Sequence, residues 1–355
     1  MTNTLKKIIV VSFIALFVFS AFSIAVDLDD AYADEPIIIT DSTGKELILN
    51  APAEKVATLG YGFTKTVVDL GGKDKIVAYD LYSEDLINEL GIEGFNVGSS
   101  YSSNKNTIVS SMILAKVDSL FDVDTDVIII NNYSGTISEN GTRDKLEEQG
   151  FKVLCFGAND YEGVVYIVEN IAKAIGKESS AALTNMISAR DSAYEAGKDI
   201  ADEDKVTAMY VNEYGGGLRI YNEGIAVSMI ELAGGKNVGF NSNISTTYYS
   251  SEASGILLLR PDVVFLDGNH SMSAKDFQKK VLRTKSIEVI KMEKDWNNYC
   301  PSSAVGLSVV SEAMLEEYDH DESIWDIISI NIEMTVAGLL AAILVIAGLL
   351  VMRRV

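Results

Sequence analysis

Tyrosine and asparagine side chains gather in the segments that follow the expected strands of this chain, and they are the residues best suited to bind a ligand. Aromatic rings stack on planar or apolar ligands while their polar tips form hydrogen bonds. In open α/β sheets a ligand lies beyond the carboxyl ends of the parallel strands. The alternative is that tyrosine-rich loops pack on themselves, as some must in a chain with 16 tyrosines. The candidate ligand-binding residues are Tyr61, Tyr79, Tyr82, Tyr101, Asn132, Tyr133, Tyr214, Arg219, Tyr248, Tyr249, His270 and Trp296.

Groups that could catalyse a reaction are scarce. The sequence has two histidines and shows no Gly-x-Ser-x-Gly elbow, phosphate-binding glycine loop or paired metal-ligand spacing. His320 lies in an acidic segment where a solvated side chain is expected, and His270 alone cannot hold a transition metal without carboxylate or tyrosine ligands. The glycines at 215–217 precede a strand-like run, which indicates a hairpin or a flexible loop. The sequence therefore predicts no enzyme, no protein-held metal and no cofactor.

A repeated pattern supplies the elements that position the candidate residues. Residues 67–77 (VVDLGGKDKIV) and 229–238 (MIELAGGKNV) each end an apolar helix at paired glycines and then begin a strand. Glycine provides the left-handed helix cap that other residues resist. Farther along, 125–130 (TDVIII) and 261–266 (PDVVFL) are short apolar runs typical of buried parallel strands. The repeat predicts an α/β fold of two Rossmann-like lobes with a ligand cleft between them.

The order of helices and strands gives the lobe boundaries. The N-terminal lobe is expected at 34–160 and the C-terminal lobe at 205–318. Residues 161–204 form two helices without an intervening strand, and the second, of about 22 residues, should be about 33 Å long. This long connecting helix would join the lobes and restrict them to small twisting and closing motions. An acidic linker, 319–333, follows the second lobe.

The two ends of the chain predict its location. Residues 1–33 have the pattern of a signal peptide, with two lysines, an uncharged stretch and a small-x-small cleavage site, and cleavage itself stays open. Residues 334–352 carry no charge and are followed by two arginines, which is typical of a transmembrane helix with a cytoplasmic end. The lobes are therefore expected outside the cell on a single-pass membrane protein.

Charge and cysteine content narrow the partners. A net charge of −22 argues against nucleic acid, whose binding requires a basic surface. The acidic balance favours solubility and identifies no ligand. Export permits a disulfide between Cys155 and Cys300. Such a bridge would join the two lobes and hinder any hinge, so we do not expect it.

Five segments, at 39–47, 55–80, 125–129, 231–238 and 260–264, have the order and spacing of a known family. Together they resemble the substrate-binding proteins of ABC importers for iron–siderophores, haem and vitamin B12, the helical-backbone type of periplasmic binding protein. The resemblance covers nearly all of residues 36–318. It implies an extracellular protein that holds a metal chelate (a ferric siderophore, haem or a corrinoid) between its lobes and delivers it to an ABC permease and its ATPase.

The resemblance also implies one acidic residue on each lobe that pairs with permease arginines, seven residues before the Pro-Asp of a strand. Asp118 holds this position in the first lobe. The matching residue of the second lobe is Ser254, so Glu252, two residues earlier, is the docking candidate there. The alternative function is a membrane-tethered surface interaction or sensory module of the same fold that feeds no permease.

The charge of the ligand can be inferred from the basic residues of the expected loops. These are few, with Lys65, Lys105 and Arg219 as the candidates. A strongly anionic ferric catecholate would require a cluster of arginines or lysines. The sequence therefore favours a neutral chelate or a corrinoid.

Overall fold

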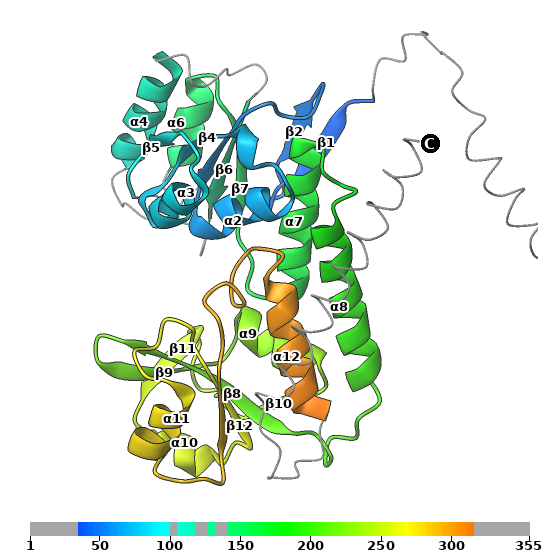
Figure 1. Cartoon of the computed structure of the whole chain (residues 1–355), viewed down its shortest axis with the longest axis vertical. Coiled ribbons are helices and arrows are strands. Elements are labelled where there is room, and N and C mark those ends of the chain that lie inside the picture. The colour runs from blue at the N-terminus through cyan, green and yellow to red at the C-terminus, as the bar shows by residue number, and fades with distance from the viewer. Residues whose placement is uncertain (1–34, 100–104, 118–125, 133–140, 316–355) are drawn as a thin grey trace, which may run out of the picture.

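The computed structural model describes residues 35–99, 105–117, 126–132 and 141–315. In these residues two lobes, each built around its own β-sheet, lie end to end (Figure 1). The predicted two-lobed α/β architecture is confirmed.

The first lobe is built on a parallel sheet in the order β5-β4-β3-β6-β7. Its strands are β3 (Val56–Leu59), β4 (Ile76–Tyr79), β5 (Phe95–Asn96), β6 (Val127–Asn131) and β7 (Lys152–Phe156). Its helices are α2 (Tyr61–Asp69), α3 (Glu84–Leu90), α4 (Lys105–Val117) and α6 (Thr142–Glu148), with the single 3₁₀ turns η1 (Lys73–Lys75) and η2 (Leu81–Ser83).

Both faces of this sheet are buried. In β6, Val127 and Ile129 belong to the apolar cluster that includes α2 residues, whereas Ile128 and Ile130 belong to the cluster that includes α4 and α6 residues. Alternate residues of a strand point to opposite faces. A continuous apolar run is therefore the pattern that this position requires, because helices cover the sheet on both sides.

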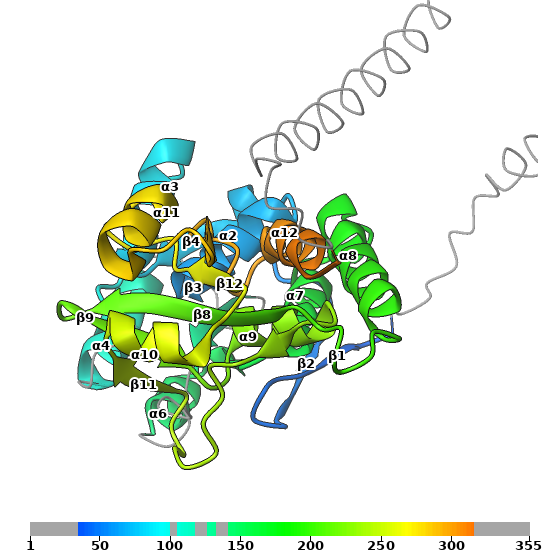
Figure 2. The same cartoon turned by 90° about the horizontal axis from the view of Figure 1, so that it is seen from below.

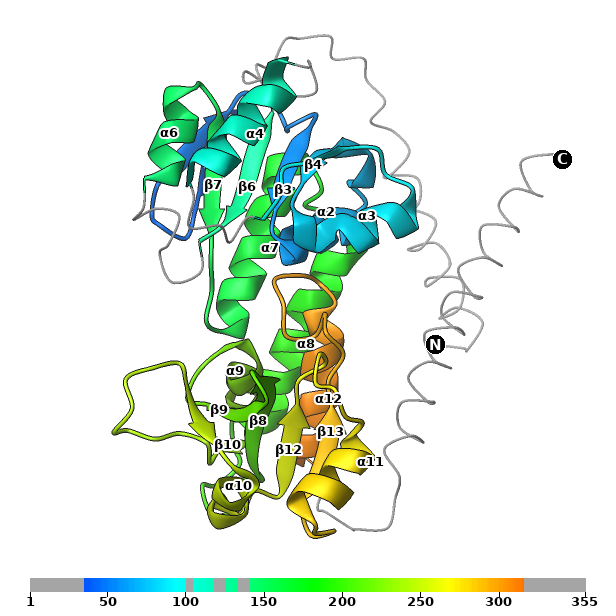
Figure 3. The same cartoon turned by 90° about the vertical axis from the view of Figure 1, so that its left-hand side faces the viewer.

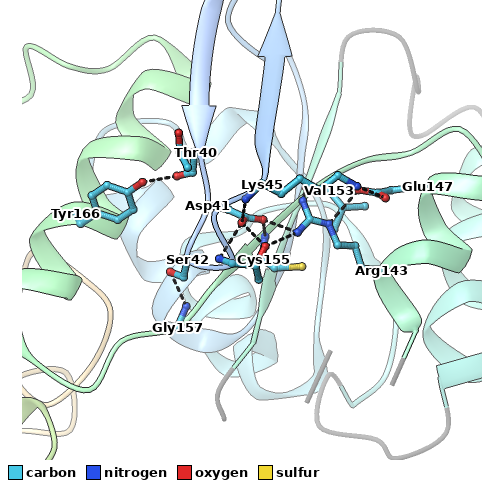
Figure 4. Close-up of polar contacts among 11 residues, drawn as sticks. Thr40, Asp41, Ser42, Lys45, Arg143, Glu147, Val153, Cys155, Gly157 and Tyr166 are labelled. Carbon is cyan, nitrogen blue, oxygen red and sulfur yellow. Dashed lines mark hydrogen bonds and ion pairs between the residues drawn. The ribbon is translucent and has the colours of Figure 1, made fainter. Parts of the chain in front are cut away.

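A buried charge network fastens the N-terminal hairpin, β1 (Ile37–Thr40) and β2 (Glu46–Leu49), to the first lobe (Figure 4). Asp41 accepts a hydrogen bond of 3.0 Å from the backbone N–H of Cys155. Its carboxylate also pairs with Arg143 at 2.8 Å, and Arg143 contacts Glu147 at 3.0 Å. Because the Asp41 and Arg143 side chains are almost fully buried, each depends on the other for its charge balance.

The second lobe has a mixed sheet in the order β11-β9-β8-β12-β13, with β10 beside the start of β8. Strands β8, β10, β12 and β13 are parallel, and β9 and β11 add an antiparallel extension. The strands are β8 (Thr207–Tyr214), β9 (Gly217–Tyr221), β10 (Lys236–Asn237), β11 (Tyr248–Ser251), β12 (Val263–Leu266) and β13 (Glu288–Lys291). The helices are α9 (Ile225–Leu232), α10 (Ala253–Leu259), α11 (Ala274–Asp276) with its π-helical continuation η4 (Phe277–Leu282), and α12 (Ser303–Leu315).

The repeated Gly-Gly pairs end helices in both lobes, as predicted. Gly71 follows α2 with φ of 81°, and Gly234 follows α9 with φ of 82°. A Cβ at Gly234 would lie 2.6 Å from the Cα of Gly197. Glycine is therefore required at this position both for the left-handed turn and for the close approach of a neighbouring helix.

Two helices, α7 (Tyr161–Ile175) and α8 (Ala181–Gly197), connect the lobes and lie beside α12 on one side of the molecule (Figure 2). The sequence prediction gave the connecting role to the second helix. The contacts show that α7 carries it as well. The Tyr161 N–H donates to Ser228 Oγ of the second lobe at 2.8 Å, and the Tyr166 hydroxyl donates to the Thr40 carbonyl of the first lobe at 2.6 Å. Helix α8 has 17 residues, fewer than expected, and packs on α7, α9 and α12.

The described residues contain no helix with the length and apolar character needed to cross a membrane. The expected signal peptide, acidic linker and transmembrane helix lie outside the described residues. Cys155 and Cys300 are buried and free, so the lobes are not joined by a disulfide. Burial raises the pKa of both thiols to about 12.

Candidate ligand-binding cleft

A cavity of about 650 Å³ lies between the lobes. The first lobe lines it with Gly60 after β3, the start of α2, the end of β6 and the loop before α7. The second lobe lines it with β8, β9, the start of α9, the start of β11 and the loop before α12. The first-lobe loops follow the carboxyl ends of parallel strands, where α/β proteins bind their ligands. The side chains that line the cavity include Tyr61, Phe63, Asn131, Tyr210, Tyr214, Arg219, Tyr221, Glu223, Tyr248, Asn297, Asn298 and Tyr299.

Arg219 is held between two tyrosine rings on the second-lobe wall. Its guanidinium carbon lies 3.7 Å from the ring centroid of Tyr214 and 4.2 Å from that of Tyr248. Such stacking stabilises the cation and fixes its plane. Among the described residues the Arg219 guanidinium forms no hydrogen bond or ion pair, so its N–H donors remain available to a ligand.

A tight turn places this stack at the cavity. Tyr214 pairs with Gly217 across β8 and β9, and the two residues between them, Gly215 and Gly216, have φ of 61° and 80°. Two consecutive positive φ values define the type I′ hairpin turn, which glycine adopts without strain. Of the two interpretations of the glycine run, the hairpin is correct.

Further tyrosines form a continuous aromatic surface behind the stack. The Tyr221 ring lies 5.0 Å from the Tyr210 ring, edge to face, and 5.5 Å from the Tyr248 ring. The hydroxyl of Tyr210 donates to Asp267 and accepts from the Asn297 amide at 2.9 Å. Burial and the neighbouring Asp267 carboxylate raise the pKa of Tyr210, so its hydroxyl stays protonated. These ring contacts and hydrogen bonds hold the aromatic side of the cavity, which we call the aromatic wall, in place.

Tyr61 brings the first lobe into contact with the second. Its hydroxyl donates to the Asp295 carboxylate at 2.7 Å, and the Lys294 ammonium lies 4.9 Å from its ring centroid. Burial, together with the hydrogen bond to Asp295, raises the pKa of Tyr61. The hydroxyl therefore remains a donor at neutral pH.

A second contact between the lobes lies next to Tyr61. The ring of Tyr299 stacks on Phe63 with centroids 5.6 Å apart, and its hydroxyl donates to the Ala158 carbonyl at 3.1 Å. Thr66 of α2 donates to the Tyr299 carbonyl. Residues 295–302, which we call the bridging segment, thus belong to the second lobe but pack on the first.

The structure brings four of the predicted ligand-binding residues together. Tyr61, Tyr214, Arg219 and Tyr248 line the cavity. Tyr101 and Tyr133 lie outside the described residues.

The other six candidates lie away from the cavity lining. Tyr79 is buried in the first-lobe core, and Tyr82 is about half exposed, with its hydroxyl next to Ser99. The Asn132 backbone N–H donates to the Phe156 carbonyl, which continues the β6–β7 pairing. In the second lobe, the Tyr249 hydroxyl donates to the Gly239 carbonyl, and Trp296 packs against the core and Gly306. His270 is described below.

His270 is a packed side chain of the second lobe. It is 4 % exposed, its ring lies edge-on to Phe277, and its Nδ1 accepts from the Met272 N–H at 3.0 Å. Burial lowers the pKa of His270, although Glu213, whose carboxylate lies 3.7 Å from Nε2, opposes this effect. Among the described residues no group of three or more His, Cys, Asp and Glu side chains could hold a metal ion.

The sequence did not single out several residues that line the cavity. Tyr210 and Tyr221 lie within strands, where an aromatic residue is normally a core residue. Asn297, Asn298 and Tyr299 lie in the bridging segment, and only the contact between the lobes places them at the cavity. The run Trp296-Asn-Asn-Tyr is rich in aromatic and amide groups and could have drawn attention.

The two predicted docking residues have different outcomes. Glu252 is exposed and immediately precedes α10. Asp118 lies outside the described residues.

Two α/β lobes, a helical connection and a cavity between the lobes define a two-lobed binding protein. The family model for periplasmic binding proteins matches residues 56–291, and the chain belongs to that family. A cobalamin-binding protein from Halobacterium salinarum is 24% identical over 232 residues, which are 64% of this chain and 58% of that protein. The chain thus spans less than two thirds of the length of this curated relative.

Solved structures agree on the fold. A periplasmic solute binding protein from Veillonella parvula superimposes with a TM-score of 0.58 at 15% identity, covering 80% of this chain and 89% of that one. The periplasmic vitamin B12 binding protein of Vibrio cholerae gives 0.52 at 16% identity, covering 74% and 96%. The family consists of substrate-binding proteins. The prediction that the chain is not an enzyme is therefore confirmed.

Proposed function

We propose that this protein is the extracellular substrate-binding component of an ABC importer and that it binds a corrinoid between its lobes. The observation that carries the proposal is the aromatic wall of the cavity with Arg219 stacked between Tyr214 and Tyr248. A flat macrocycle with polar groups at its edge matches this wall. Its face can lie on the tyrosine rings while the guanidinium edge donates hydrogen bonds to its amide or phosphate oxygens.

The charges of the lining favour a corrinoid over the other chelates. The lining has one guanidinium, Arg219, and one carboxylate, Glu223. A ferric catecholate carries several negative charges and would require several arginines or lysines. Haem brings two carboxylates, for which this lining offers one cation. The name of the relative from Halobacterium salinarum, a cobalamin-binding protein, supports the same choice.

Titration of the purified full-length protein tests the ligand. We expect cyanocobalamin to bind with a Kd in the micromolar range or tighter, and haemin and a ferric catecholate to bind more weakly. Tyr248→Ala removes one ring of the Arg219 stack and should raise the Kd about tenfold, since such a contact contributes about 1–1.5 kcal/mol. Tyr82→Ala is the matched control, because Tyr82 is an exposed tyrosine away from the cavity.

Each outcome decides a different part of the proposal. If no chelate binds at micromolar concentration, the metal-chelate proposal is wrong. If haemin binds best, the protein binds a chelate but the choice of a corrinoid is wrong. If Tyr248→Ala and Tyr82→Ala bind alike, the ligand does not use this wall.

Delivery to a permease is the second part of the proposal. The family resemblance supports it, and the sequences of 1–33 and 334–352 support a location on the outer face of the cell membrane. Asp118→Lys and Glu252→Lys should leave corrinoid binding unchanged and reduce cellular uptake, because they reverse the charge offered to permease arginines. Normal uptake would refute this docking assignment. Binding without any contribution to uptake would favour the tethered sensory module.

A further inference from the structure

Helices α10 and α11 lie at the end of the second lobe that points away from the first (Figure 3), and leucines and cations occur together in this region. Leu258 of α10 is 82% exposed, the highest value for a large apolar side chain among the described residues, and Leu257 is 40% exposed. Arg260 follows directly and is also exposed. Helix α10 contacts η4, whose Lys279 is exposed. The apolar and basic side chains are therefore neighbours.

The strand register places more cations at this edge. Strands β12 and β13 are parallel, with Val263 opposite Glu288. Arg260 precedes Val263 by three residues, and Lys285 precedes Glu288 by three. Both therefore lie at the amino ends of neighbouring strands. We call the following six residues the distal patch: Leu257, Leu258, Arg260, Lys279, Arg283 and Lys285.

The four cations of the distal patch form no ion pair with the carboxylates nearest to them. Asp262, beside Arg260, accepts hydrogen bonds from the backbone N–H and the hydroxyl of Thr207 at 2.9 and 2.7 Å. Asp276 pairs with Lys280 at 3.1 Å. Among the ion pairs of the described residues, none involves the four cations of the patch. These four exposed cations are available to an external anion, although the chain as a whole has a net charge of −22.

The backbone conformation of two of these arginines gives an independent reason to infer that their side chains have a role beyond the fold. Arg260 and Arg283 cap α10 and η4 with φ of 49° and 54°. Every other described residue with positive φ is a glycine. The left-handed conformation disfavours residues with a Cβ, so the fold alone would favour glycine at both caps. Arginine in place of glycine at these two caps puts a guanidinium at the edge of the lobe, where it can bind an anionic partner.

We propose that the distal patch binds the anionic lipid surface of the membrane. Exposed leucines among lysines and arginines are typical of protein faces that rest on such a surface. The path of the chain supports this occupant. A Cβ at Gly235 would lie 2.2 Å from Sδ of Met314 near the end of α12, and the next residue, Lys236, pairs with Thr207.

Thr207 also bonds Asp262 next to the patch. Helix α12 therefore ends at the same edge of the lobe as the distal patch, and the uncharged residues 334–352 follow in the sequence. This proposal rests on the membrane location proposed above, but not on the identity of the ligand. With the patch on the lipid, the first lobe points away from the membrane, so docking of both lobes on a permease requires the patch to leave the lipid.

Fluorescence quenching in vesicles tests the proposal. The full chain carries an environment-sensitive label at Ser286→Cys, an exposed serine beside Lys285, while both natural cysteines are buried. Ser110→Cys on α4 of the first lobe is the matched control, because it is also an exposed serine. The vesicles contain nitroxide-headgroup lipid in phosphatidylcholine, with or without phosphatidylglycerol.

We expect strong quenching at 286 and weak quenching at 110, only with phosphatidylglycerol present. Each basic residue changed to glutamine should lower the ratio of docked to undocked protein about fivefold, so a triple variant of Arg260, Arg283 and Lys285 should lower it about 100-fold. High salt should act in the same direction. Arg260→Gly with Arg283→Gly should lose quenching while the melting temperature stays equal or rises, which separates docking from folding.

Four outcomes would overturn the proposal. Equal quenching at 286 and 110 would show that the patch does not face lipid. Quenching that ignores lipid charge and salt would show that cations do not matter. Cross-links between labelled positions of two chains in detergent would identify a second copy as the occupant. If the chain does not float with the vesicles at all, both the membrane anchor and the lipid contact are wrong.

Discussion

Replacement of Tyr61 by phenylalanine should loosen the contact between the two lobes. The hydroxyl of Tyr61 is the donor to the Asp295 carboxylate at 2.7 Å, and the ring that Lys294 faces remains in the variant. A hydrogen bond to a charged group contributes about 1.5–3 kcal/mol when it is buried. Both side chains are partly exposed, so water compensates part of the loss and we expect about 1 kcal/mol. The ratio of joined to separated lobes should then fall about fivefold.

Pulsed electron paramagnetic resonance between spin labels at Ser110→Cys and Ser286→Cys measures this ratio, since the two labels lie on different lobes. Tyr61→Phe should broaden the distance distribution relative to the parent. Tyr82→Phe is the matched control, because its hydroxyl lies 3.2 Å from Ser99 within the first lobe. Identical distributions for Tyr61→Phe and Tyr82→Phe would refute the assignment of Tyr61 as a link between the lobes.

Three further substitutions test the packing and electrostatics of the fold. Arg143→Met leaves the buried Asp41 carboxylate without its ion pair and should reduce the free energy of unfolding by about 3 kcal/mol and Tm by roughly 6–10 °C. Arg190→Met removes ion pairs with the exposed Glu162 and Asp191 and should change Tm little; equal effects of the two variants in calorimetry would contradict this. Gly62→Ala places a Cβ 2.3 Å from an oxygen of the bridging segment and should reduce the free energy of unfolding by about 1–3 kcal/mol, so an unchanged Tm would show that the segment moves freely. Burial lowers the pKa of His270 below its ordinary 6.5, and its contribution to stability is present above about pH 6.5 and lost as pH falls toward the folded pKa. His270→Gln should therefore lose less Tm between about pH 7.5 and 5.5 than the parent does, while His320→Gln should lose as much as the parent; the same loss in both variants would contradict the reasoning.

Helices and strands could be predicted from the sequence where their own residues carry the start signal, the end signal and the apolar pattern. Strand β6 (Val127–Asn131) coincides closely with the predicted run at 125–130, and helix α7 (Tyr161–Ile175) begins at 161, where the pair of connecting helices is predicted to begin. The first is an apolar run between turns, and the second has an N-cap aspartate, Asp160, and a glycine end. Strand β11 (Tyr248–Ser251) was missed. It exists because it pairs with β9, and its half-exposed Tyr-Tyr-Ser-Ser sequence carries no buried-strand signal.

The residues of the candidate site also divide into those that the sequence could predict and those that it could not. Tyr61 could be identified because it closely follows β3, and that position in an α/β sheet implies nearness to the cleft. Tyr248 was chosen as a loop residue but lies in β11, and it reaches the cavity through the pairing of β11 with β9. Tyr210 could not, since a tyrosine inside a strand faces either the core or the cavity according to how the lobes pack. The stack on Arg219 required the diagonal arrangement of three strands, which no local pattern encodes.

The bridging segment couples the shape of the ligand cavity to the relative position of the two lobes. Tyr299 lines the cavity from the second lobe while its ring stacks on Phe63 of the first. Asn297 donates to the Tyr210 hydroxyl and accepts from the Ala226 N–H, so the same segment also holds the aromatic wall. A movement of one lobe relative to the other must therefore shift groups that line the cavity. The duplicated scaffold supplies two similar lobes, but the cavity depends on this unduplicated segment that belongs to one lobe and packs on the other.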